Sequence, residues 1–296
     1  MDTRLKFRIG DKLPLTLEDV YNDEQASAAQ ADSYSIIGAS VRGRLHHYNN
    51  IPRDDAFAAR FNGVWLAVGV ADGAGSRSRS RYGASFSSHR LCGRLFQAVA
   101  RVRGKVHDHG GASGSLKDVV LQAFRHTRVD LEQFASKHGV GLDELHCTLL
   151  GLILNTATGE VGVGQIGDGL ILGLNETTEA KPLAEPAATD DLGASYFLTQ
   201  ADWEDYLYVN DITAEKAKHF SAFYLMTDGV ANDCQYGPPT DILKRWANDM
   251  NREIRLIPSL EKTAERLKNY LASYQAKGSF DDRTLVVVYT DQKDVM

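Results

Sequence analysis

Cysteine is scarce in this sequence. The 296 residues include three cysteines, Cys92, Cys147 and Cys234, and no two of them form a CxxC pair. A scattered, odd-numbered set of this kind argues against both a disulfide framework and a zinc–thiolate site. We therefore expect a protein of the reducing cytoplasm.

Long apolar runs and an excess of positive charge are also missing. No uninterrupted apolar run approaches the roughly 18 residues that a membrane span requires, and residues 1–25 lack an apolar core of signal-peptide length. The formal net charge of −6 argues against a general affinity for nucleic acid. We expect neither a membrane nor a nucleic acid as a partner.

Strand-like apolar segments recur along the chain, and several stand in adjacent pairs. They cover 34–41, 55–72, 145–155, 161–174, 222–228 and 283–291. Asn62-Gly63 and Thr158-Gly159 lie between apolar runs, where such pairs are typical of short hairpins. The pattern therefore favours antiparallel pairing.

Helices are predicted where apolar residues recur at helical spacing. These segments are 83–100, 115–138, 240–250 and 259–274. Ser115 can cap the second of them, and the helices come in two pairs without a regular β-α-β alternation. The sequence thus predicts an α+β fold in which helices cover antiparallel sheets. We expect residues 1–33 to form an irregular lead-in and residues 34–292 to form a single domain.

Three of the apolar runs end on an Asp-Gly pair. Asp168-Gly169 is followed at once by another apolar run, as expected of a hairpin turn. Asp72 and Asp228 are followed instead by small-residue loops that lead toward helices. A hairpin does not require an aspartate at the end of a fully apolar strand, whereas a metal site does, because rigid strand ends hold hard oxygen ligands in place.

Two further acidic pairs, Asp54-Asp55 and Asp281-Asp282, stand just before predicted strands. Acidic strand ends from distant parts of one chain indicate a shared cleft, and clustered carboxylates repel one another unless cations are bound. Ligation by oxygen alone favours Mg²⁺ or Mn²⁺ over zinc. Two such ions close together can activate a water for in-line attack on phosphorus.

The order of these motifs resembles that of the metal-dependent protein serine/threonine phosphatases of type 2C, in their bacterial branch. The motifs are GRLHHYNNIPRDDAF, VADGAG, CTLLGLIL, IGDG, LMTDGV and FDDRTLVVV, and they span about residues 34 to 290. The resemblance implies two packed antiparallel β-sheets flanked by pairs of helices, an α-β-β-α sandwich. It also implies a signalling hydrolase that removes phosphate from phosphoserine and phosphothreonine in proteins, opposite a serine/threonine kinase.

The resemblance also implies a metal site with two ions, Mn²⁺ or Mg²⁺. Asp72 corresponds to the carboxylate that bridges both ions, and the Gly73 carbonyl corresponds to a further ligand. Asp228 and Asp281 correspond to the remaining ligands of one ion.

Other acidic positions have less direct counterparts. Asp54 stands where the family has Glu or Gln, and Asp55 stands where it has Asp; both would act directly or through metal-bound water. Asp143 lies upstream of Thr148 at about the spacing of the aspartate that holds a third ion in bacterial members. Asp168 belongs to a family motif but is not expected to touch a metal.

Two positions depart from the family pattern. His46 replaces the phosphate-binding arginine, and the spacer to the acidic pair is longer. The missing cation could be protonated His46 or one of three arginines, Arg42, Arg44 or Arg53. Ala74 stands where some members carry a histidine that is a candidate proton donor to the leaving group.

Two functions of different classes remain open, and a third, a metal-dependent phosphoesterase that acts on small molecules, differs from the first only in its substrate. The first is the phosphatase, with Asp72, Asp228 and His46 as its catalytic residues. The second is a catalytically weak homologue that binds phosphoproteins or a partner as a signalling module, which the departures favour. The strip Ser76–Arg81, SRSRSR, is either a phosphopeptide-docking strip or the solvated start of a helix. Phosphatases with a nucleophilic aspartate are not expected, because the sequence has no DxDxT motif.

Overall fold

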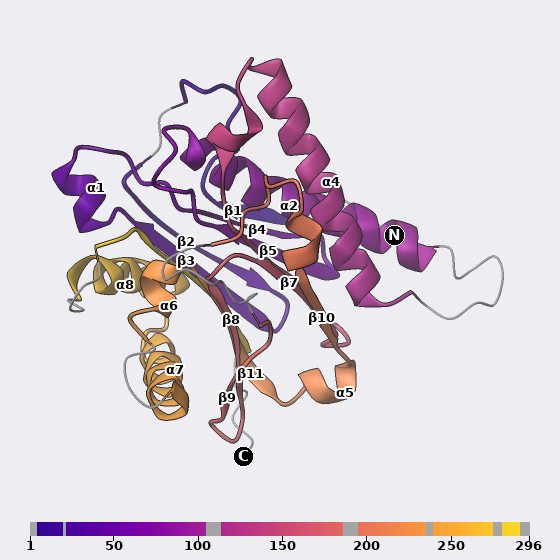
Figure 1. Cartoon of the computed structure of the whole chain (residues 1–296). Coiled ribbons are helices and arrows are strands. Elements are labelled where there is room, and N and C mark those ends of the chain that lie inside the picture. Colours follow the sequence, from indigo (N-terminus) through magenta and orange to yellow (C-terminus); the bar gives the residue numbers. More distant parts are fainter. Residues whose placement is uncertain are drawn as a thin grey trace.

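Two six-stranded antiparallel β-sheets lie face to face, and helices cover both outer faces (Figure 1). The computed structural model describes residues 5–19, 22–104, 114–185, 195–234, 239–274 and 280–290. Sheet A has the strand order β1-β4-β5-β6-β7-β10, and sheet B has the order β2-β3-β12-β11-β8-β9. The predicted α+β sandwich is confirmed.

The strands of sheet A are β1 (Phe7–Gly10), β4 (Ala56–Phe61), β5 (Trp65–Ala71), β6 (Leu149–Asn155), β7 (Val161–Ile166) and β10 (Tyr208–Ile212). Those of sheet B are β2 (Glu24–Ala31), β3 (Tyr34–Val41), β12 (Arg283–Thr290), β11 (Phe220–Met226), β8 (Leu170–Asn175) and β9 (Ala180–Pro182). Both predicted hairpins are present, because β4 pairs with β5 across Asn62-Gly63 and β6 pairs with β7 across Thr158-Gly159.

The long helices lie where the apolar periodicity predicts them. They are α2 (Ser80–Gly104) and α4 (Leu116–Lys137) on sheet A, and α7 (Pro239–Arg255) and α8 (Leu260–Ser273) on sheet B. Short helical turns are α1 (Arg44–Tyr48), η1 (Leu142–Leu145), η2 (Trp203–Tyr206), α5 (Ala214–Ala217) and α6 (Asp228–Ala231). Ser115 caps α4 by accepting a hydrogen bond from the Asp118 N–H. Of the helices in the described ranges, none has both the length and the apolar character that crossing a membrane requires.

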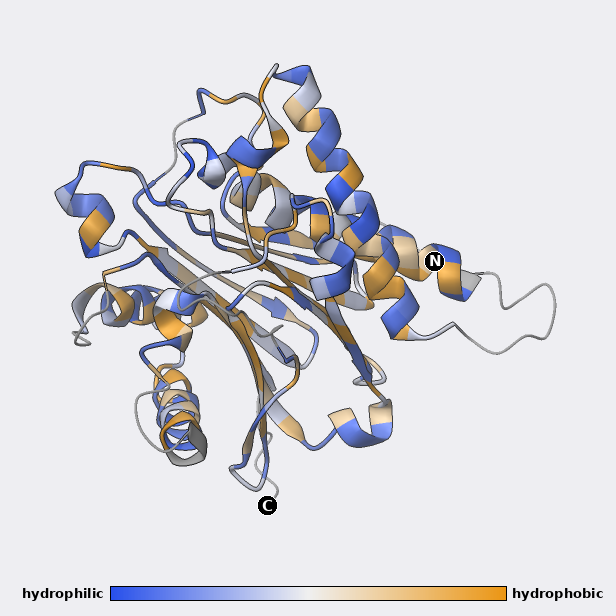
Figure 2. Cartoon of the chain, viewed as in Figure 1, coloured by the Kyte–Doolittle hydropathy of each residue, from blue (hydrophilic) through white to orange (hydrophobic). Residues whose placement is uncertain are grey.

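Each sheet is buried on both faces, and β12 shows how one strand serves two cores. Val286 and Val288 pack between the sheets, whereas Leu285 and Val287 pack under α7 and α8. Because successive side chains of a strand point to opposite faces, a strand buried on both faces is apolar at nearly every position. Figure 2 accordingly shows hydrophobic colour along the inner strands and mixed colour along the covering helices.

The N-terminal segment corrects one prediction, since its described residues include two strands and do not form an irregular lead-in. β1 pairs with β4 at one edge of sheet A, and β2 pairs with β3 along its full length at one edge of sheet B. The sequence of β2, EQASAAQA, is small and polar and carries no apolar alternation. Its strand conformation therefore comes from pairing with β3 and packing beneath α8, which override a weak local preference.

Asp168-Gly169 is not a hairpin turn, which corrects a second prediction. β7 belongs to sheet A and β8 belongs to sheet B, so the chain passes from one sheet to the other at residues 167–169. Gly167 has a φ of 101°, a conformation that favours glycine. The two apolar runs follow each other in the sequence but never pair with each other.

A buried polar cluster ties β1 to the chain that enters β4. The Asp11 carboxylate accepts hydrogen bonds from the Arg53 guanidinium and, at 3.0 Å, from the Phe57 N–H. Arg53 is only 2% exposed. His89 of α2 donates from Nε2 to the Asp11 carbonyl, and its Nδ1 lies 3.4 Å from an Arg60 nitrogen. A neutral ring protonated on Nε2 satisfies both of these contacts.

We predict that His89 makes stability depend on pH. Burial lowers the pKa of His89 from 6.5 to about 4. The imidazole is therefore protonated at a higher pH in the unfolded chain than in the folded chain. The contribution of neutral His89 to the free energy of unfolding is fully present above pH 6.5. It is lost as the pH falls toward 4, and the loss is on the order of 3 kcal/mol. Urea unfolding between pH 4 and 8 measures it. His89→Gln keeps a donor and an acceptor, so the variant should lose less stability on acidification, and equal losses would refute the assignment.

Candidate metal centre

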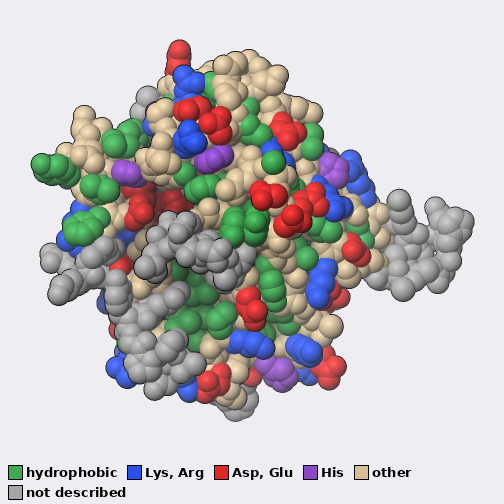
Figure 3. Space-filling model, in the orientation of Figure 1, with side chains coloured by type: hydrophobic (Ala, Val, Ile, Leu, Met, Phe, Trp, Pro, Cys, Tyr) green, Lys and Arg blue, Asp and Glu red, His purple; other side chains and the backbone are tan. Residues whose placement is uncertain are grey.

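The acidic strand ends gather at one edge of the sandwich. In sheet A, Ala56 at the start of β4 pairs with Ala71 at the end of β5, which brings Asp54 and Asp55 close to Asp72. In sheet B, Met226 at the end of β11 pairs with Leu285 of β12, which brings Asp228 close to Asp281. The predicted clustering of these five carboxylates is therefore what the strand registers produce. Figure 3 shows acidic side chains on the floor of a hollow on this face.

The two sheets meet at Asp72 and Asp228, which lie close enough that Asp228, after burial and Asp55, is among the groups that raise the pKa of Asp72. A cavity of about 270 Å³ opens beside them. Its lining residues are Leu45, His46, Asn49, Ile51, Asp72, Gly73, Ala74, Gly75, Thr148, Asp168, Ser195, Phe197 and Asp281. Carboxylates from both sheets thus border one open space large enough for a phosphoryl group and water.

Two buried carboxylate oxygens in this cluster have no hydrogen-bond partner. They are Oδ1 of Asp55 and Oδ1 of Asp228. The other oxygen of Asp55 accepts hydrogen bonds from the hydroxyls of Thr227 (2.8 Å) and Thr284 (2.7 Å), so the carboxylate is held in a fixed orientation. Buried oxygens of this kind are costly unless a cation or donor satisfies them.

The donor set fits hard divalent cations. All the candidate donors are oxygens, which Mg²⁺ and Mn²⁺ prefer. Among the described residues, no three His, Cys, Asp or Glu side chains converge closely enough to coordinate one ion by themselves. Mg²⁺ commonly binds through one or two carboxylates and keeps several waters, so a sparse set of protein ligands suits it.

The carboxyl groups resist losing their protons without such a cation. Burial is the main cause that raises the pKa of Asp54 and of Asp228 to about 7. Burial and neighbouring carboxylates also raise the pKa values of Asp55, Asp72 and Asp281. Because ligands must be deprotonated, cation binding here displaces protons and weakens as the pH falls.

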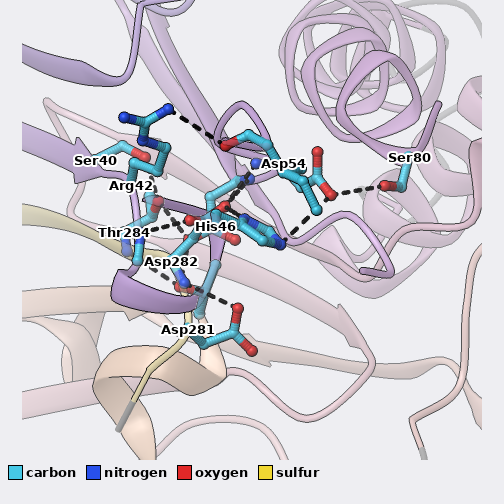
Figure 4. A network of polar contacts seen from close by, with 12 residues as sticks. Ser40, Arg42, His46, Asp54, Ser80, Asp281, Asp282 and Thr284 are labelled. Atoms are coloured by element: carbon cyan, nitrogen blue, oxygen red, sulfur yellow. Dashed lines mark hydrogen bonds and ion pairs between the residues drawn. The ribbon is translucent and has the colours of Figure 1, made fainter. Parts of the chain in front are cut away.

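Asp282 holds the parts of the site together, a role that the sequence did not reveal. Its carboxylate accepts hydrogen bonds from the N–H groups of Gly43 and Asp54, both at 2.6 Å, and from His46 Nδ1 at 3.0 Å (Figure 4). The neighbouring Asp281 lines the cavity instead. The Asp-Asp pair therefore divides into one residue that faces the cavity and one that fixes the surrounding backbone.

His46 is the cationic residue of the cavity wall. It lies on α1, is 8% exposed, and places Nε2 4.0 Å from an Asp54 oxygen. The hydrogen bond to Asp282 is the main cause that raises the pKa of His46 to about 9, so the ring carries a positive charge at neutral pH.

The three alternative arginines do not reach the cavity. Arg53 is buried against Asp11, and Arg42 forms an ion pair with Asp23 at 3.2 Å. Arg44 is exposed, and no Lys or Arg is found among the described residues that line the cavity. Among the candidates considered for the missing cation, His46 alone has the required position.

Asp143 lies on η1, and its carboxylate is 3.3 Å from Arg77 in the Ser76–Arg81 strip. A third ion at Asp143 would have to compete with this arginine, and the predicted role stays a prediction.

The Ser76–Arg81 strip is not wholly solvated, because Ser80 Oγ donates to an Asp54 oxygen at 3.2 Å. The start of α2 thus contacts the acidic cluster.

The remaining predicted positions lie on the cavity wall. A Cβ at Gly73 would come within 2.9 Å of the Asp54 carbonyl oxygen, so only glycine fits there without a shift. Ala74 lines the cavity and offers no proton donor. Asp168, expected in a turn, instead lines the cavity and accepts a hydrogen bond from Ser195 at 3.0 Å. The Asp-Gly pair that Asp168 shares with Asp72 and Asp228 was the sequence signal that could have placed Asp168 at the cavity.

A protein-family model matches most of the sequence. The sequence model of the family Protein phosphatase 2C matches residues 42–276, well over half of the chain. The chain belongs to the protein phosphatase 2C family. No curated protein has a sequence that matches this one.

Solved structures share the fold at low sequence identity. A serine-threonine phosphatase 2C from Toxoplasma gondii has a TM-score of 0.62 and 11% identity, covering 90% of this chain and 99% of that one. A Caenorhabditis elegans sex determining protein has a TM-score of 0.55 and 12% identity, covering 88% of this chain and 66% of that one. The catalytic domain of the serine threonine protein phosphatase PstP, solved with two manganese ions, has a TM-score of 0.50 and 16% identity, covering 87% and 99%.

Proposed function

We propose that this protein hydrolyses phosphoserine and phosphothreonine in proteins at a binuclear Mn²⁺ or Mg²⁺ centre. The observation that carries the proposal is a cluster of acidic strand ends, with two unpartnered buried oxygens, beside an open cavity that Asp72 and Asp281 line. The family of the chain agrees with this chemistry. The residues that would hold the ions are Asp54, Asp55, Asp72, Asp228, Asp281 and the carbonyl of Gly73, with Asp143 for a third ion.

Each part of the cavity has a distinct task. Two divalent ions, when bound, lower the pKa of water and neutralise charge on a phosphoryl group. Asp55 is oriented by Thr227 and Thr284, and the backbone of Asp54 is fixed by Asp282, so the ligand oxygens need little rearrangement. The His46 cation would draw the phosphoryl group toward the metal ligands, because it is the positive charge on this wall.

A second function, a weakly catalytic module that binds phosphoproteins, is favoured by two observations. A single imidazolium replaces a bidentate arginine, and Ala74 cannot donate a proton to the leaving group. In either case a phosphorylated protein is the partner, and a serine/threonine kinase would oppose the enzyme.

The three cysteines are buried and free, which agrees with a reducing cytoplasm.

Metal-dependent hydrolysis of p-nitrophenyl phosphate and of a phosphothreonine peptide tests the choice. We expect turnover with Mn²⁺ that a chelator abolishes and that fresh Mn²⁺ restores. His46→Gln should raise KM for the peptide about tenfold, the loss expected for one charge-assisted hydrogen bond. A wild-type protein that binds Mn²⁺ by calorimetry but hydrolyses neither compound would overturn the phosphatase and leave the binding module.

A further inference from the structure

Exposed apolar side chains gather at the rim of the cavity. Eight large hydrophobic side chains are strongly exposed in the described part of the chain. Four of them are Leu45 (54% exposed), Tyr48 (88%), Ile51 (38%) and Phe280 (54%). We call these four the α1 patch. Figure 3 shows hydrophobic side chains gathered over the edge of the molecule where α1 lies, next to the acidic hollow.

Backbone hydrogen bonds hold the segments that carry the α1 patch next to one another. The Leu45 N–H donates to the Phe280 carbonyl at 3.0 Å, which places the start of α1 against the chain before β12. Leu45 and Tyr48 are three residues apart on a helix and therefore share a face. The Ile51 N–H donates to the His46 carbonyl at 2.8 Å, so the chain after α1 returns to the same helix.

The backbone just before α1 is packed directly against the backbone of Asp281. A Cβ on Gly43, just before α1, would lie 2.2 Å from the Asp281 carbonyl carbon, so the two backbones are in direct contact. Arg42 also donates to the Ile51 carbonyl and pairs with Asp23. Side chains that are presented on a fixed backbone lose little conformational freedom when a partner covers them.

The patch continues into the cavity itself. Leu45 and Ile51 line the cavity together with Asp72 and Asp281. A peptide whose phosphorylated side chain enters the cavity from the α1 side runs across this rim. No Lys or Arg lines the described part of the cavity wall, so acidic residues beside the phosphate would gain no ion pair there. On the α1 side of the cavity, the surface available to recognise the flanking residues is apolar.

We propose that the α1 patch selects phosphoprotein substrates that carry a large apolar side chain within a few residues of the phosphoserine or phosphothreonine. This inference rests on the proposed function of the cavity. The patch buries the apolar side chain of the substrate, and His46 together with the cations that the acidic cluster would hold binds its phosphate. Tyr48 is the specificity-determining residue on the protein side, because it is the most exposed member and does not line the cavity.

A set of phosphothreonine peptides tests the proposal. The peptides have an uncharged Ser/Gly background, and a single Leu is moved from three residues before the phosphothreonine to three residues after it. For at least one position we expect kcat/KM about tenfold above that of the peptide without Leu, the size expected when one apolar side chain is buried. Tyr48→Ser should abolish this advantage, whereas Tyr48→Leu should keep it.

Two controls separate specificity from general damage. Hydrolysis of p-nitrophenyl phosphate, which lacks flanking residues, should be unchanged in Tyr48→Ser. Leu256→Ser removes another strongly exposed apolar side chain (63% exposed) that does not line the cavity, and it should keep the preference for Leu. Equal kcat/KM for all peptides in the wild type, or a preference that survives Tyr48→Ser, would overturn the proposal. So would a dimer that Tyr48→Ser dissociates without a change in peptide preference.

Failure of the proposed function gives a different result. A protein that hydrolyses none of these compounds with Mn²⁺ lacks the phosphatase activity, and fluorescence anisotropy with the same peptides then decides the role of the patch. Leu-dependent binding that Tyr48→Ser weakens about tenfold supports the patch, and binding that ignores Leu refutes it.

Discussion

Asp72→Asn should lower metal-dependent hydrolysis about a thousandfold or more while leaving the fold intact. Asp72 lies close to the carboxylates of Asp55 and Asp228 and borders the cavity together with Asp281. Asparagine has the same shape but carries no charge, so it would weaken both cation binding and the electrostatic stabilisation of a phosphoryl group, whose loss typically costs several orders of magnitude in rate. Initial rates with p-nitrophenyl phosphate over a Mn²⁺ titration measure the effect.

The same substitution should not destabilise the metal-free protein. Burial and the carboxylates of Asp55, Asp228 and Asp281 raise the pKa of Asp72, so the ionised group is unfavourable there without a cation. We expect the thermal midpoint of metal-free Asp72→Asn to equal or exceed that of the wild type. Asp205→Asn, an exposed change on η2, is the matched control and should leave the rate unchanged. Wild-type activity in Asp72→Asn would exclude Asp72 from the metal site.

Asp11→Ala should cost about 3–5 kcal/mol in the free energy of unfolding, the range measured when one member of a buried ion pair is removed. Arg53 is among the largest fully buried side chains, and Asp11 supplies its carboxylate partner. Asp11 also accepts a hydrogen bond from the Phe57 N–H, which would lose its partner. Urea unfolding of the metal-free protein measures the loss.

A double substitution tests whether the pair causes the loss. Asp11→Ala combined with Arg53→Met removes both charges and leaves an apolar side chain of similar length, so it should recover most of the stability. The double-mutant cycle isolates the interaction between the two residues. Loss of less than about 1 kcal/mol in Asp11→Ala would contradict the structure, because an unpaired buried guanidinium costs more than this.

The sequence predicted the elements that obey local rules. Apolar periodicity, the Ser115 cap and the Asn62-Gly63 turn each act over a few residues, and all were found in place. β2 was missed because its alanines and glutamines form a strand only against β3. Asp168 was misplaced because an Asp-Gly pair looks the same within a hairpin and between two sheets.

The acidic cluster was predicted from strand ends, but its supporting residues were not. Asp281 and Asp282 are neighbours of one residue type, and only the three-dimensional structure shows which of them faces the cavity. The ion pair of Asp11 with Arg53 joins residues 42 positions apart, and no local sequence pattern predicts it. The family resemblance indicated which positions matter, whereas the hydrogen bonds show how they are held.

The carboxylates of the acidic cluster come from two separate sheets, so substitutions far from the cluster can change their spacing. Asp72 belongs to an end of sheet A and Asp228 to an end of sheet B, so the separation of their oxygens depends on how one sheet is stacked on the other. That stacking is set by side chains such as Phe57, Val286 and Val288, which lie between the sheets. A substitution that changes the size of a side chain between the sheets therefore changes the distance between these carboxylates. The affinity for cations can then change even though every carboxylate is retained.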